Sequence, residues 1–545
     1  MVMKPSAQGR AAVSAHRVVV VGAGIGGLVS ALLLACRGLQ VTLVEAAATP
    51  GGKMRQVLVD GASIDAGPTV FTMRWVLEQI LAEAGAGMDA LPTLQPLGVL
   101  ARHAWAGQGA GQGAAKEQRL DLYADPARSA QAIGEFSGAA EARRFQAFCA
   151  EARRVYDQLE GPYIRSSKPT LLSMPMDLGP RGLATLTGLG PMTSLWSLLS
   201  RRFSDPRLQQ LFGRYATYCG ASPWMAPATL MLVAQVELDG VWAVQGGMHA
   251  VACALAELAA ARGVVLRYGQ AVKRIEVSGG RVSGVRLASG ETLAADSVVY
   301  NGDPAMLAHG LLDDPSLPAV KPPPRAQRSL SAVTWAMHVR SQGFPLVRHN
   351  VFFDADYRSE FDDIFHHRRL PRRGTVYLCA QDRSDSGAPV PGRERLLCLV
   401  NAPADGDRPL SDRHHDELEA DACEQRTLTL LQRCGLTLQT SPTQVLRTLP
   451  QDFHHLFPGS GGALYGTATH GWMALFKRPG AATALPGLYL AGGAVHPGPG
   501  VPMAAMSGRL AAATLLAHLD STSRSRRVHI SGGISTRSAT TAATP

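Results

Sequence analysis

The sequence has little charge and few aromatic side chains for its length of 545 residues. Charged residues make up 18% and apolar residues 46%, a balance that excludes an intrinsically disordered chain. Aromatic residues make up only 6%, which disfavours the stacking of single-stranded nucleic acid, and we expect no nucleic-acid partner. The 53 Lys and Arg exceed the 43 Asp and Glu, but this excess of +10 alone does not distinguish nucleic acid, anionic lipid and a phosphate-bearing cofactor.

Closely spaced cysteine pairs are also absent. No two of the eight cysteines form a CxxC pair, which argues against a zinc ribbon or an iron–sulfur site, and we expect no metal. Eight cysteines in so long a chain do not make a disulfide scaffold, so we expect buried thiols in a reducing cytoplasm. No secretory signal precedes the first apolar run, which begins at Val18.

That apolar run, Val18 to Cys36, has no charged residue and is long enough to be a membrane helix. Four glycines interrupt it, however, and a β-branched stretch, Val18 to Val21, comes first. The pattern therefore favours a strand, a tight turn and a helix. A second strand is expected over Val41 to Glu45, so the segment is a predicted βαβ unit.

The turn of this unit carries a GxGxxG motif. Gly22 allows the tight turn, Gly24 allows the backbone to approach a pyrophosphate, and Gly27 allows the helix to pack closely on the strand. The helix N-terminus then presents free N–H groups and its positive dipole end to the phosphates. Glu45 closes the second strand, where a carboxylate accepts hydrogen bonds from a ribose. The motif predicts a dinucleotide site.

Two further glycine-rich segments favour FAD over NAD. The sequence PGGKM follows Glu45, and its Gly52 and Lys53 can lie beside a ribose and a phosphate. Near the C-terminus, a strand, the pair Gly492–Gly493 and a helix from about Met503 repeat the strand–turn–helix pattern. A second helix N-terminus suits a second contact with one long ligand, so we expect FAD.

The sequence resembles the flavin amine oxidase and carotenoid desaturase superfamily, and within it the phytoene desaturase type. The matching segments extend from Val18 to Arg509 and include VVVVGAGIGGLVSALLLACRG, VTLVEAAATPGGKM, IDAGPTVFT and GLYLAGGAVHPGPGVPMAAMSGR. AGPTVFTMRWV, LYGTATHGWMALFKRPG and the HPGPGVPM form of the last loop resemble the bacterial 1-hydroxycarotenoid 3,4-desaturases, also called methoxyneurosporene dehydrogenases.

The resemblance implies an α/β fold: a Rossmann-type FAD-binding domain, an interleaved α+β substrate domain and a helical cap. It places the FAD-binding domain in residues 16–90, 235–305 and 478–520, and the substrate and cap regions in 91–234 and 306–477. We expect a disordered Ser/Thr-rich tail over 521–545. By the same resemblance, Val272 binds adenine through its backbone, and four residues approach the isoalloxazine or its ribityl chain: Gly493, Val501, Pro502 and Met503.

The activity that the resemblance implies is FAD-dependent desaturation of an acyclic 1-hydroxy or 1-methoxy carotenoid at its 3,4 bond, by hydride transfer to the flavin. A quinone or oxygen would be the electron acceptor. Phytoene desaturation, carotenoid isomerisation and an amine oxidase-like activity are the alternatives. His496 and His470 are the candidate bases, although each histidine can also simply pack or cap its loop. Thr467, Thr469 and His470 are candidate readers of the substrate hydroxyl.

An apolar substrate implies contact with a membrane. The run Pro169 to Ser200, with Trp196 and Phe203 nearby, is apolar enough to lie in a bilayer interface, and Arg201 and Arg202 suit its rim. The alternative is a buried cap over the substrate tunnel. We therefore expect a cytoplasmic protein that is peripheral to the inner membrane.

Overall fold

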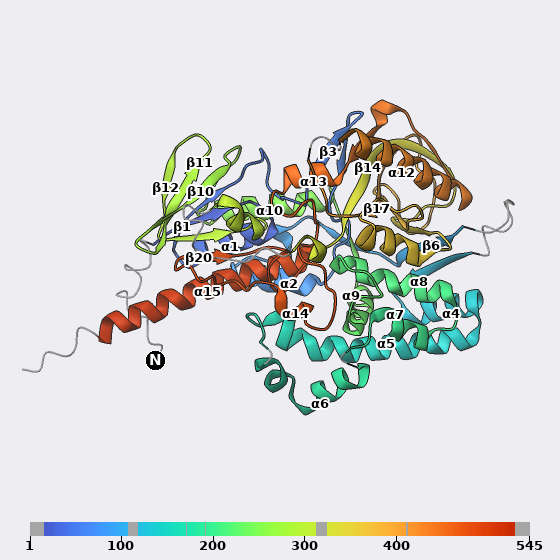
Figure 1. The fold of residues 1–545 in the computed structure, drawn as a ribbon, viewed down its shortest axis with the longest axis horizontal. Coiled ribbons are helices and arrows are strands. Elements are labelled where there is room, and N and C mark those ends of the chain that lie inside the picture. The colour runs from blue at the N-terminus through green and yellow to red at the C-terminus, as the bar shows by residue number, and fades with distance from the viewer. Residues whose placement is uncertain are drawn as a thin grey trace, which may run out of the picture.

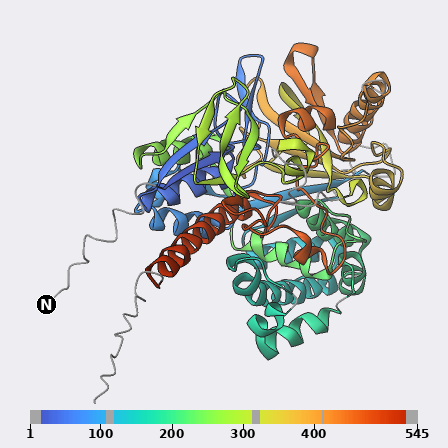
Figure 2. The same cartoon turned by 60° about the vertical axis from the view of Figure 1, so that its left-hand side comes forward.

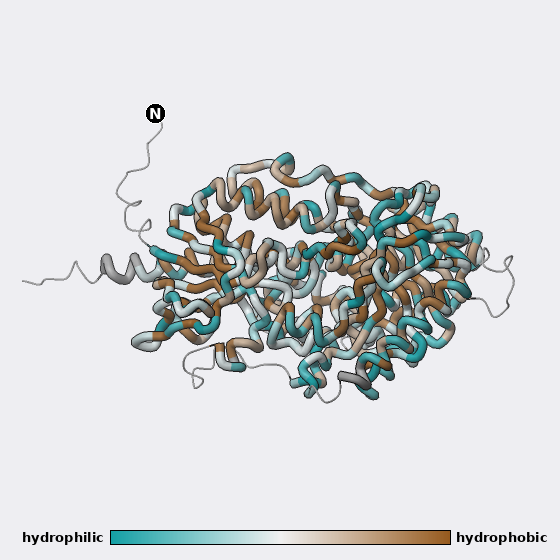
Figure 3. The backbone as a smooth tube through the Cα atoms, turned by 90° about the horizontal axis from the view of Figure 1, so that it is seen from above, coloured by the Kyte–Doolittle hydropathy of each residue, from teal (hydrophilic) through white to brown (hydrophobic). Residues whose placement is uncertain are grey.

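The computed structural model describes residues 16–106, 118–170, 172–190, 192–311, 324–409 and 413–528. Figure 1 shows three regions: a nucleotide-binding region at the left, a sheet region at the upper right and a helical region below it. The same regions stay separate when the molecule is turned in Figure 2. Hydrophobic segments lie mostly inside and hydrophilic ones mostly along the periphery (Figure 3).

The nucleotide-binding region is built on a five-stranded parallel sheet with the order β20-β13-β1-β2-β9. The predicted βαβ unit forms its centre, and Val18, Val20 and Leu43 are almost completely buried, as the uncharged run requires. The elements are β1 (Arg17–Val21), α1 (Ile25–Cys36), β2 (Gln40–Val44), β9 (Val265–Arg267), β13 (Ser297–Tyr300) and β20 (Leu488–Leu490).

Helices α1, α10 (Met248–Ala261) and α15 (Val501–Val528) pack on this sheet. The contact between α1 and α15 is tight because a Cβ at Gly508 would overlap the carbonyl oxygen of Gly26. Ser30 joins the two helices by donating to the carbonyls of Gly26 (2.8 Å) and Gly508 (3.0 Å). A small antiparallel sheet of β10 (Val272–Ser278), β11 (Arg281–Leu287) and β12 (Thr292–Ala294) completes the region.

The sheet region is a mixed eight-stranded sheet. Helix α12 (Arg413–Arg433) packs beside it, as Figure 1 shows. The strands are β6 (Val99–Trp105), β7 (Arg119–Tyr123), β14 (Ser331–Gly343), β15 (His349–Phe353), β16 (Val376–Ala380), β17 (Glu394–Ala402), β18 (Leu436–Gln439) and β19 (Val445–Thr448).

The helical region has its own apolar core, in which Phe148, Phe203 and Phe212 pack ring against ring. Phe203 is therefore buried, so the expectation that it lies in a bilayer interface was wrong. Trp196 stacks on Trp224 at 4.4 Å and stays partly exposed, so its place near the interface stays a prediction. The elements are α4 (Pro126–Ser137), α5 (Ala139–Leu159), η3 (Glu160–Arg165), α6 (Ser173–Leu189), α7 (Leu195–Arg202), α8 (Pro206–Gly213), η4 (Arg214–Cys219), η5 (Ala228–Met231) and α9 (Leu232–Leu238).

Smaller elements connect the three regions. They are β3 (Gln56–Val59), β4 (Ala62–Asp65), α2 (Arg74–Glu83), η2 (Met88–Ala90), β5 (Leu94–Pro96), β8 (Trp242–Val244), η6 (Leu307–Leu311), η7 (Arg325–Gln327), α11 (Tyr357–Phe361), η8 (Asp362–His366), η10 (Pro442–Gln444), α13 (Pro450–Leu456) and α14 (Ala474–Lys477).

The C-terminal segment differs from the expected disordered tail over 521–545. Helix α15 continues to Val528, because no glycine or proline follows Gly508 within it to end the helix. Residues 529–545 lie outside the described residues. Within the described ranges, no helix combines the length and apolar character needed to cross a bilayer. All eight cysteines are free thiols, of which four are buried and four are partly buried.

Candidate active site

The glycine motif forms a closed turn between β1 and α1. Gly22 has a φ of +100°, a conformation that side chains disfavour, and its N–H donates to Val44 O (2.7 Å). A Cβ at Gly27 would overlap the carbonyl oxygen of Gly22, which confirms the close packing of helix on strand. Gly24 is the N-cap of α1 and supplies no side chain to its first turn. This backbone cradle fits a diphosphate.

Glu45 lies directly after β2, beside this cradle. Its carboxylate accepts from Ala23 N (2.6 Å) and Ala47 N (2.8 Å), so two backbone groups fix its position. A carboxylate has about four acceptor positions, so lone pairs remain for ribose hydroxyls. Gln270 N donates to Glu45 O (2.8 Å), which brings Val272, the first residue of β10, to the same edge of the sheet. The arrangement fits the adenosine end of a dinucleotide.

The second glycine segment packs directly on the first. Gly51 N donates to Ala23 O (2.8 Å), and a Cβ at Gly52, where φ is +57°, would lie 3.2 Å from Gly24 Cα. The Lys53 ammonium donates to Leu464 O (2.7 Å), and its place along the phosphates stays a prediction. The side chain is accessible to solvent, yet dense surrounding protein desolvates the ammonium and lowers the pKa of Lys53 to about 8.

Asn301 joins the glycine segments, and the sequence reasoning missed it. Its side-chain Nδ2 donates to Gly22 O (3.3 Å), and a Cβ at Gly24 would lie 2.7 Å from the same nitrogen. A Cβ at Gly492 would lie 3.0 Å from Asn301 Oδ1. The available signal was its position: a polar residue directly after the buried strand β13, at the carboxyl edge where parallel sheets bind ligands.

The C-terminal glycine block lies at the same edge. Strands β1 and β20 are parallel members of one sheet, and each leads into a helix, α1 or α15. Both helix N-termini therefore lie at the carboxyl edge of this sheet. Helix α15 begins at Val501, two residues before the predicted start, and its first turn contains Pro502 and Met503. This arrangement fits one long ligand that both helix ends contact.

Arg478, a second residue that the sequence reasoning missed, holds Gly493 in place. It is 3% exposed and donates to three carbonyls: Gly493 O (3.3 Å), Tyr465 O (2.9 Å) and Thr467 O (2.7 Å). Arg478 thereby ties the segment 465–467 to the C-terminal glycine loop. Nothing at a motif spacing marks this residue, because its partners lie on two separate loops.

His496 lies in that loop and is 2% exposed. Its Nε2 donates to Ser166 O (3.1 Å), and its ring packs edge-on against Tyr163 at 4.9 Å. Desolvation lowers the pKa of His496 to about 4, so the ring is neutral at pH 7. These contacts support the packing role, and the catalytic role of His496 stays a prediction.

The second candidate base, His470, is likewise held by protein. Its Nε2 accepts from Ser222 N (3.0 Å), and burial lowers the pKa of His470 to about 4. Thr469 Oγ1 donates to Cys219 O (3.3 Å), and Thr467 gives its carbonyl to Arg478. The segment 467–470 thus holds the loop after η4, and the side chains of Thr469 and His470 already have partners. Their roles toward substrate stay predictions.

Asp65 has a structural role at long range. Its carboxylate accepts from Met248 N (2.6 Å) and caps the start of α10, and a Cβ at Gly247 would overlap it. Within the described residues no group of His, Cys, Asp and Glu side chains is arranged to hold a metal ion.

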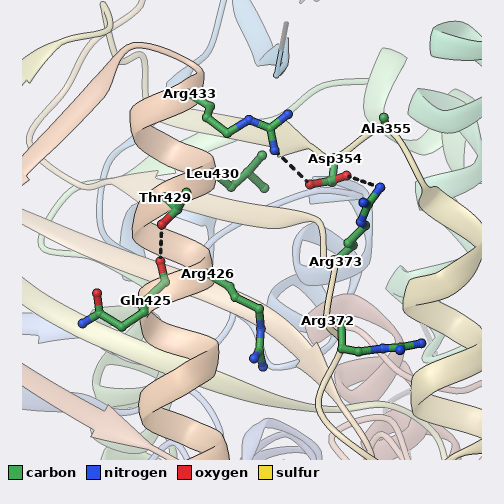
Figure 4. Close-up of a pocket in the computed structure, with 9 residues that line it drawn as sticks. All are labelled: Asp354, Ala355, Arg372, Arg373, Gln425, Arg426, Thr429, Leu430 and Arg433. Carbon is green, nitrogen blue, oxygen red and sulfur yellow. Dashed lines mark hydrogen bonds and ion pairs between the residues drawn. The ribbon is translucent and has the colours of Figure 1, made fainter. Parts of the chain in front are cut away.

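An open pocket of about 690 Å³ lies elsewhere, between α12 and the loops that follow β15 and precede β16. Figure 4 shows Arg426 and Arg433 on the helix and Arg372 and Arg373 on the opposite loop. Asp354 lies between Arg433 (3.5 Å) and Arg373 (3.8 Å). None of the glycine segments lines this pocket, so it is not the dinucleotide site.

The family comparison agrees with this geometry. Residues 25–516 match the model of the flavin-containing amine oxidoreductases. The chain belongs to this family. The match confirms the predicted α/β fold and FAD, and the chain is an FAD-dependent oxidoreductase.

Similar proteins support the carotenoid desaturase resemblance. The chain is 68% identical to a hydroxyneurosporene desaturase of Rubrivivax gelatinosus, over 96% of this chain and 98% of that one. It is 27% identical to a 1-hydroxycarotenoid 3,4-desaturase of a Flavobacterium, over 91% and 98% of the two chains. A solved putrescine oxidase bound to putrescine shares the fold, with 16% identity, a TM-score of 0.57 and coverage of 92% and 99%.

Proposed function

We propose that this flavoprotein desaturates an acyclic carotenoid with a 1-hydroxy or 1-methoxy end at its 3,4 bond. The 68% identity to a hydroxyneurosporene desaturase, which extends over almost the whole of both chains, carries the proposal. The site is consistent with it, because the groups around the C-terminal glycine loop are desolvated and a carotenoid is nearly all hydrocarbon.

Gly22, Gly24 and Gly27 would hold the diphosphate, Glu45 the ribose and Val272 the adenine, while Gly493, Val501, Pro502 and Met503 would face the flavin ring or ribityl chain. FAD supplies the hydride acceptor for desaturation when it is bound. The protein contributes a dry, fixed setting: Arg478 holds the loop of Gly493, and Asn301 holds the two glycine segments together. A quinone or oxygen then takes the electrons.

The proton that leaves the substrate needs only a weak base. Hydride loss beside a polyene leaves a positive charge spread along the conjugated chain, and this acidifies the neighbouring C–H. Effective general bases have a pKa near the working pH, and burial lowers the pKa of both His496 and His470 to about 4. The neutral His496 ring, which keeps a lone pair on Nδ1, or water would suffice for this step, whereas His470 would first have to release Ser222 N.

Peripheral membrane contact through α6 and its flanking turns is part of the proposal. Large apolar side chains are exposed there: Leu172 (84%), Met176 (83%) and Met192 (85%). Met225 and Trp472 extend this surface, because Gly471 N donates to Met225 O and Ala228 N donates to Thr193 O. Such a patch suits a protein that takes an apolar substrate from a bilayer at the cytoplasmic side of the inner membrane.

Flotation with liposomes tests this contact. Replacing Leu172 and Met176 together by serine should abolish flotation of the FAD-loaded protein, because it removes the most exposed apolar side chains at the N-terminal end of α6. Leu418→Ser is the matched control, since Leu418 is 55% exposed on α12, away from this surface. No flotation of the wild type, or equal flotation of all three proteins, would contradict membrane contact through α6.

Substrate competition tests the activity itself. The purified protein should turn over a 1-hydroxy acyclic carotenoid with a kcat/KM at least about 10-fold above that for phytoene, since a site that bonds a hydroxyl rejects its hydrocarbon analogue. Equal turnover would make it a general phytoene desaturase. Peroxide release with amines would instead indicate an amine oxidase.

A further inference from the structure

A polar cluster lies between the helical region and the large sheet. Its members are Arg214 and two tyrosines of η4 (Tyr215 and Tyr218), Glu237 on α9 and Tyr377 on β16. Glu237 accepts from Tyr215 Oη (2.9 Å) and Tyr218 Oη (2.8 Å). Arg214 Nη1 donates to Tyr218 Oη (2.9 Å). We call these residues the Arg214 cluster.

The Arg214 guanidinium is fixed but has spare donors. It lies 5.2 Å from the ring centre of Tyr218 and 5.1 Å from that of Tyr377, so two aromatic faces hold it. A guanidinium has five N–H donors. Among the described residues, the Arg214 guanidinium makes one hydrogen bond, to Tyr218. Arg214 is only partly buried, so the surrounding protein does not enclose the whole residue.

Two separate chains of contacts connect the cluster to the cofactor segments. The end of η4 packs on the segment that Arg478 ties to Gly493: a Cβ at Gly220 would lie 2.8 Å from Tyr465 Cβ. On the other side, Tyr377 Oη bonds Thr69 Oγ1 at 2.6 Å, and Thr69 closely follows Gly67, where a Cβ would overlap Lys53 O.

The charges of the cluster are balanced. Burial raises the pKa of Glu237, and the tyrosine hydroxyls and the Arg214 charge oppose this rise. Tyr218 links the Arg214 guanidinium to the Glu237 carboxylate, so the pair carries less net positive charge than a lone arginine would. A smaller positive charge repels the developing positive charge on the substrate less strongly. The pair therefore supplies hydrogen-bond donors without a strong opposing field.

We propose that Arg214 reads the oxygen at C1 of the substrate and determines the enzyme's preference for hydroxy and methoxy ends. This inference rests on the proposed function. The C1 oxygen lies only a few bonds from the 3,4 carbons, so its reader must lie beside the reacting end. A hydroxyl and a methyl ether both accept hydrogen bonds, whereas only the hydroxyl donates one; a guanidinium donor thus serves both end groups.

The test compares kcat/KM for three substrates of one chain length: the 1-hydroxy carotenoid, its methyl ether and the plain hydrocarbon. Arg214→Gln should lower the hydroxy-to-hydrocarbon ratio by about 10- to 100-fold, and the ether-to-hydrocarbon ratio similarly, because the lost bond concerns the oxygen alone. The double variant Arg214→Gln with Glu237→Gln leaves no buried carboxylate unpaired, and it should show the same loss of selectivity if the single variant fails to fold.

Arg383→Gln is the matched control. Arg383 is buried and, like Arg214, lies near a carboxylate, here Glu394 (2.7 Å), but it belongs to the sheet region. It should lower stability and leave both ratios within about threefold of wild type. Unchanged ratios in both Arg214 variants, or an equal loss in Arg383→Gln, would overturn the proposal. A wild type that does not desaturate the hydroxy substrate would overturn the proposed function itself.

Discussion

The cofactor end of this protein and the substrate end that we propose around Arg214 are built in different ways. At the cofactor end, glycines let backbone contact backbone, as where Gly27 meets Gly22 and Gly52 meets Gly24. At the substrate end, side chains from η4, α9 and β16 meet around Arg214 and Glu237. The first end depends mainly on close backbone contacts between glycines, with Asn301 and Glu45 beside them, and the second depends on side chains.

This difference predicts different responses to substitution. One added methyl group should damage the cofactor end, because a close-packed backbone cannot move aside. The substrate end should tolerate changes of shape better than changes of hydrogen bonding, because its selectivity depends on buried polar groups whose unpaired state is costly.

Gly27→Ala should have the largest effect. Its Cβ would overlap the Gly22 carbonyl, so α1 must shift from β1, and unfolding should become easier by about 3 kcal/mol or more. Thermal unfolding and flavin content measure this. Gly188→Ala is the control, because a Cβ there meets nothing within 4 Å and helical alanine is favoured. Wild-type stability of Gly27→Ala would contradict the tight turn.

Gly24→Val should weaken FAD binding about 100-fold, close to 2.7 kcal/mol, while much of the fold remains. The sequence suggested a clash with the pyrophosphate, and the structure adds a Cβ contact of 2.7 Å with Asn301 Nδ2. Titration of the apoprotein with FAD measures the change. The double variant Gly24→Val with Asn301→Ala separates the two causes. If its FAD affinity returns toward wild type, the clash with Asn301 causes the loss. If its FAD affinity stays low, the clash with the pyrophosphate causes it. Full flavin occupancy in Gly24→Val would refute the site.

His349 should make the substrate end sensitive to acid. Burial lowers its pKa from 6.5 to about 3, so its stabilisation is complete above pH 6.5 and is lost as the pH falls toward 3. Wild type should therefore lose about 1–2 kcal/mol more than His349→Phe between pH 7 and pH 5, measured by urea unfolding. His455 is exposed, so His455→Phe should lose as much stability as wild type between pH 7 and pH 5. Parallel curves for all three proteins would contradict the desolvation of His349.

Asn301→Ala should have the smallest effect, about 1 kcal/mol of stability, because it removes one hydrogen bond to Gly22. Calorimetry of the FAD-loaded protein measures the loss. Asn301→Asp is the matched variant: it keeps the shape but replaces the donor with a carboxylate, so it should lose at least as much. A stable Asn301→Asp would mean that the amide only fills space between the glycine segments.

The cofactor end could be largely predicted from sequence, whereas the substrate end could not. Gly22, Gly24, Gly27 and Glu45 lie within one βαβ unit, so local spacing determines their geometry. Asn301 is marked only by its place directly after β13, and Arg478 acts through two separate loops, so no local pattern marks it. From the sequence alone, Thr469 and His470 were reasonable candidates for bonding a substrate hydroxyl, because both side chains are polar. In the structure, both side chains have partners on the loop after η4. Only the three-dimensional arrangement identifies Arg214 as a candidate for binding the substrate oxygen.

Mass analysis of a carotenoid after anaerobic incubation with the FAD-loaded protein tests the central claim most directly. With a 1-hydroxy acyclic carotenoid, we expect a product that has lost two hydrogens, a red-shifted polyene spectrum and an equal amount of bleached flavin. A product of unchanged mass would contradict the account and indicate isomerisation.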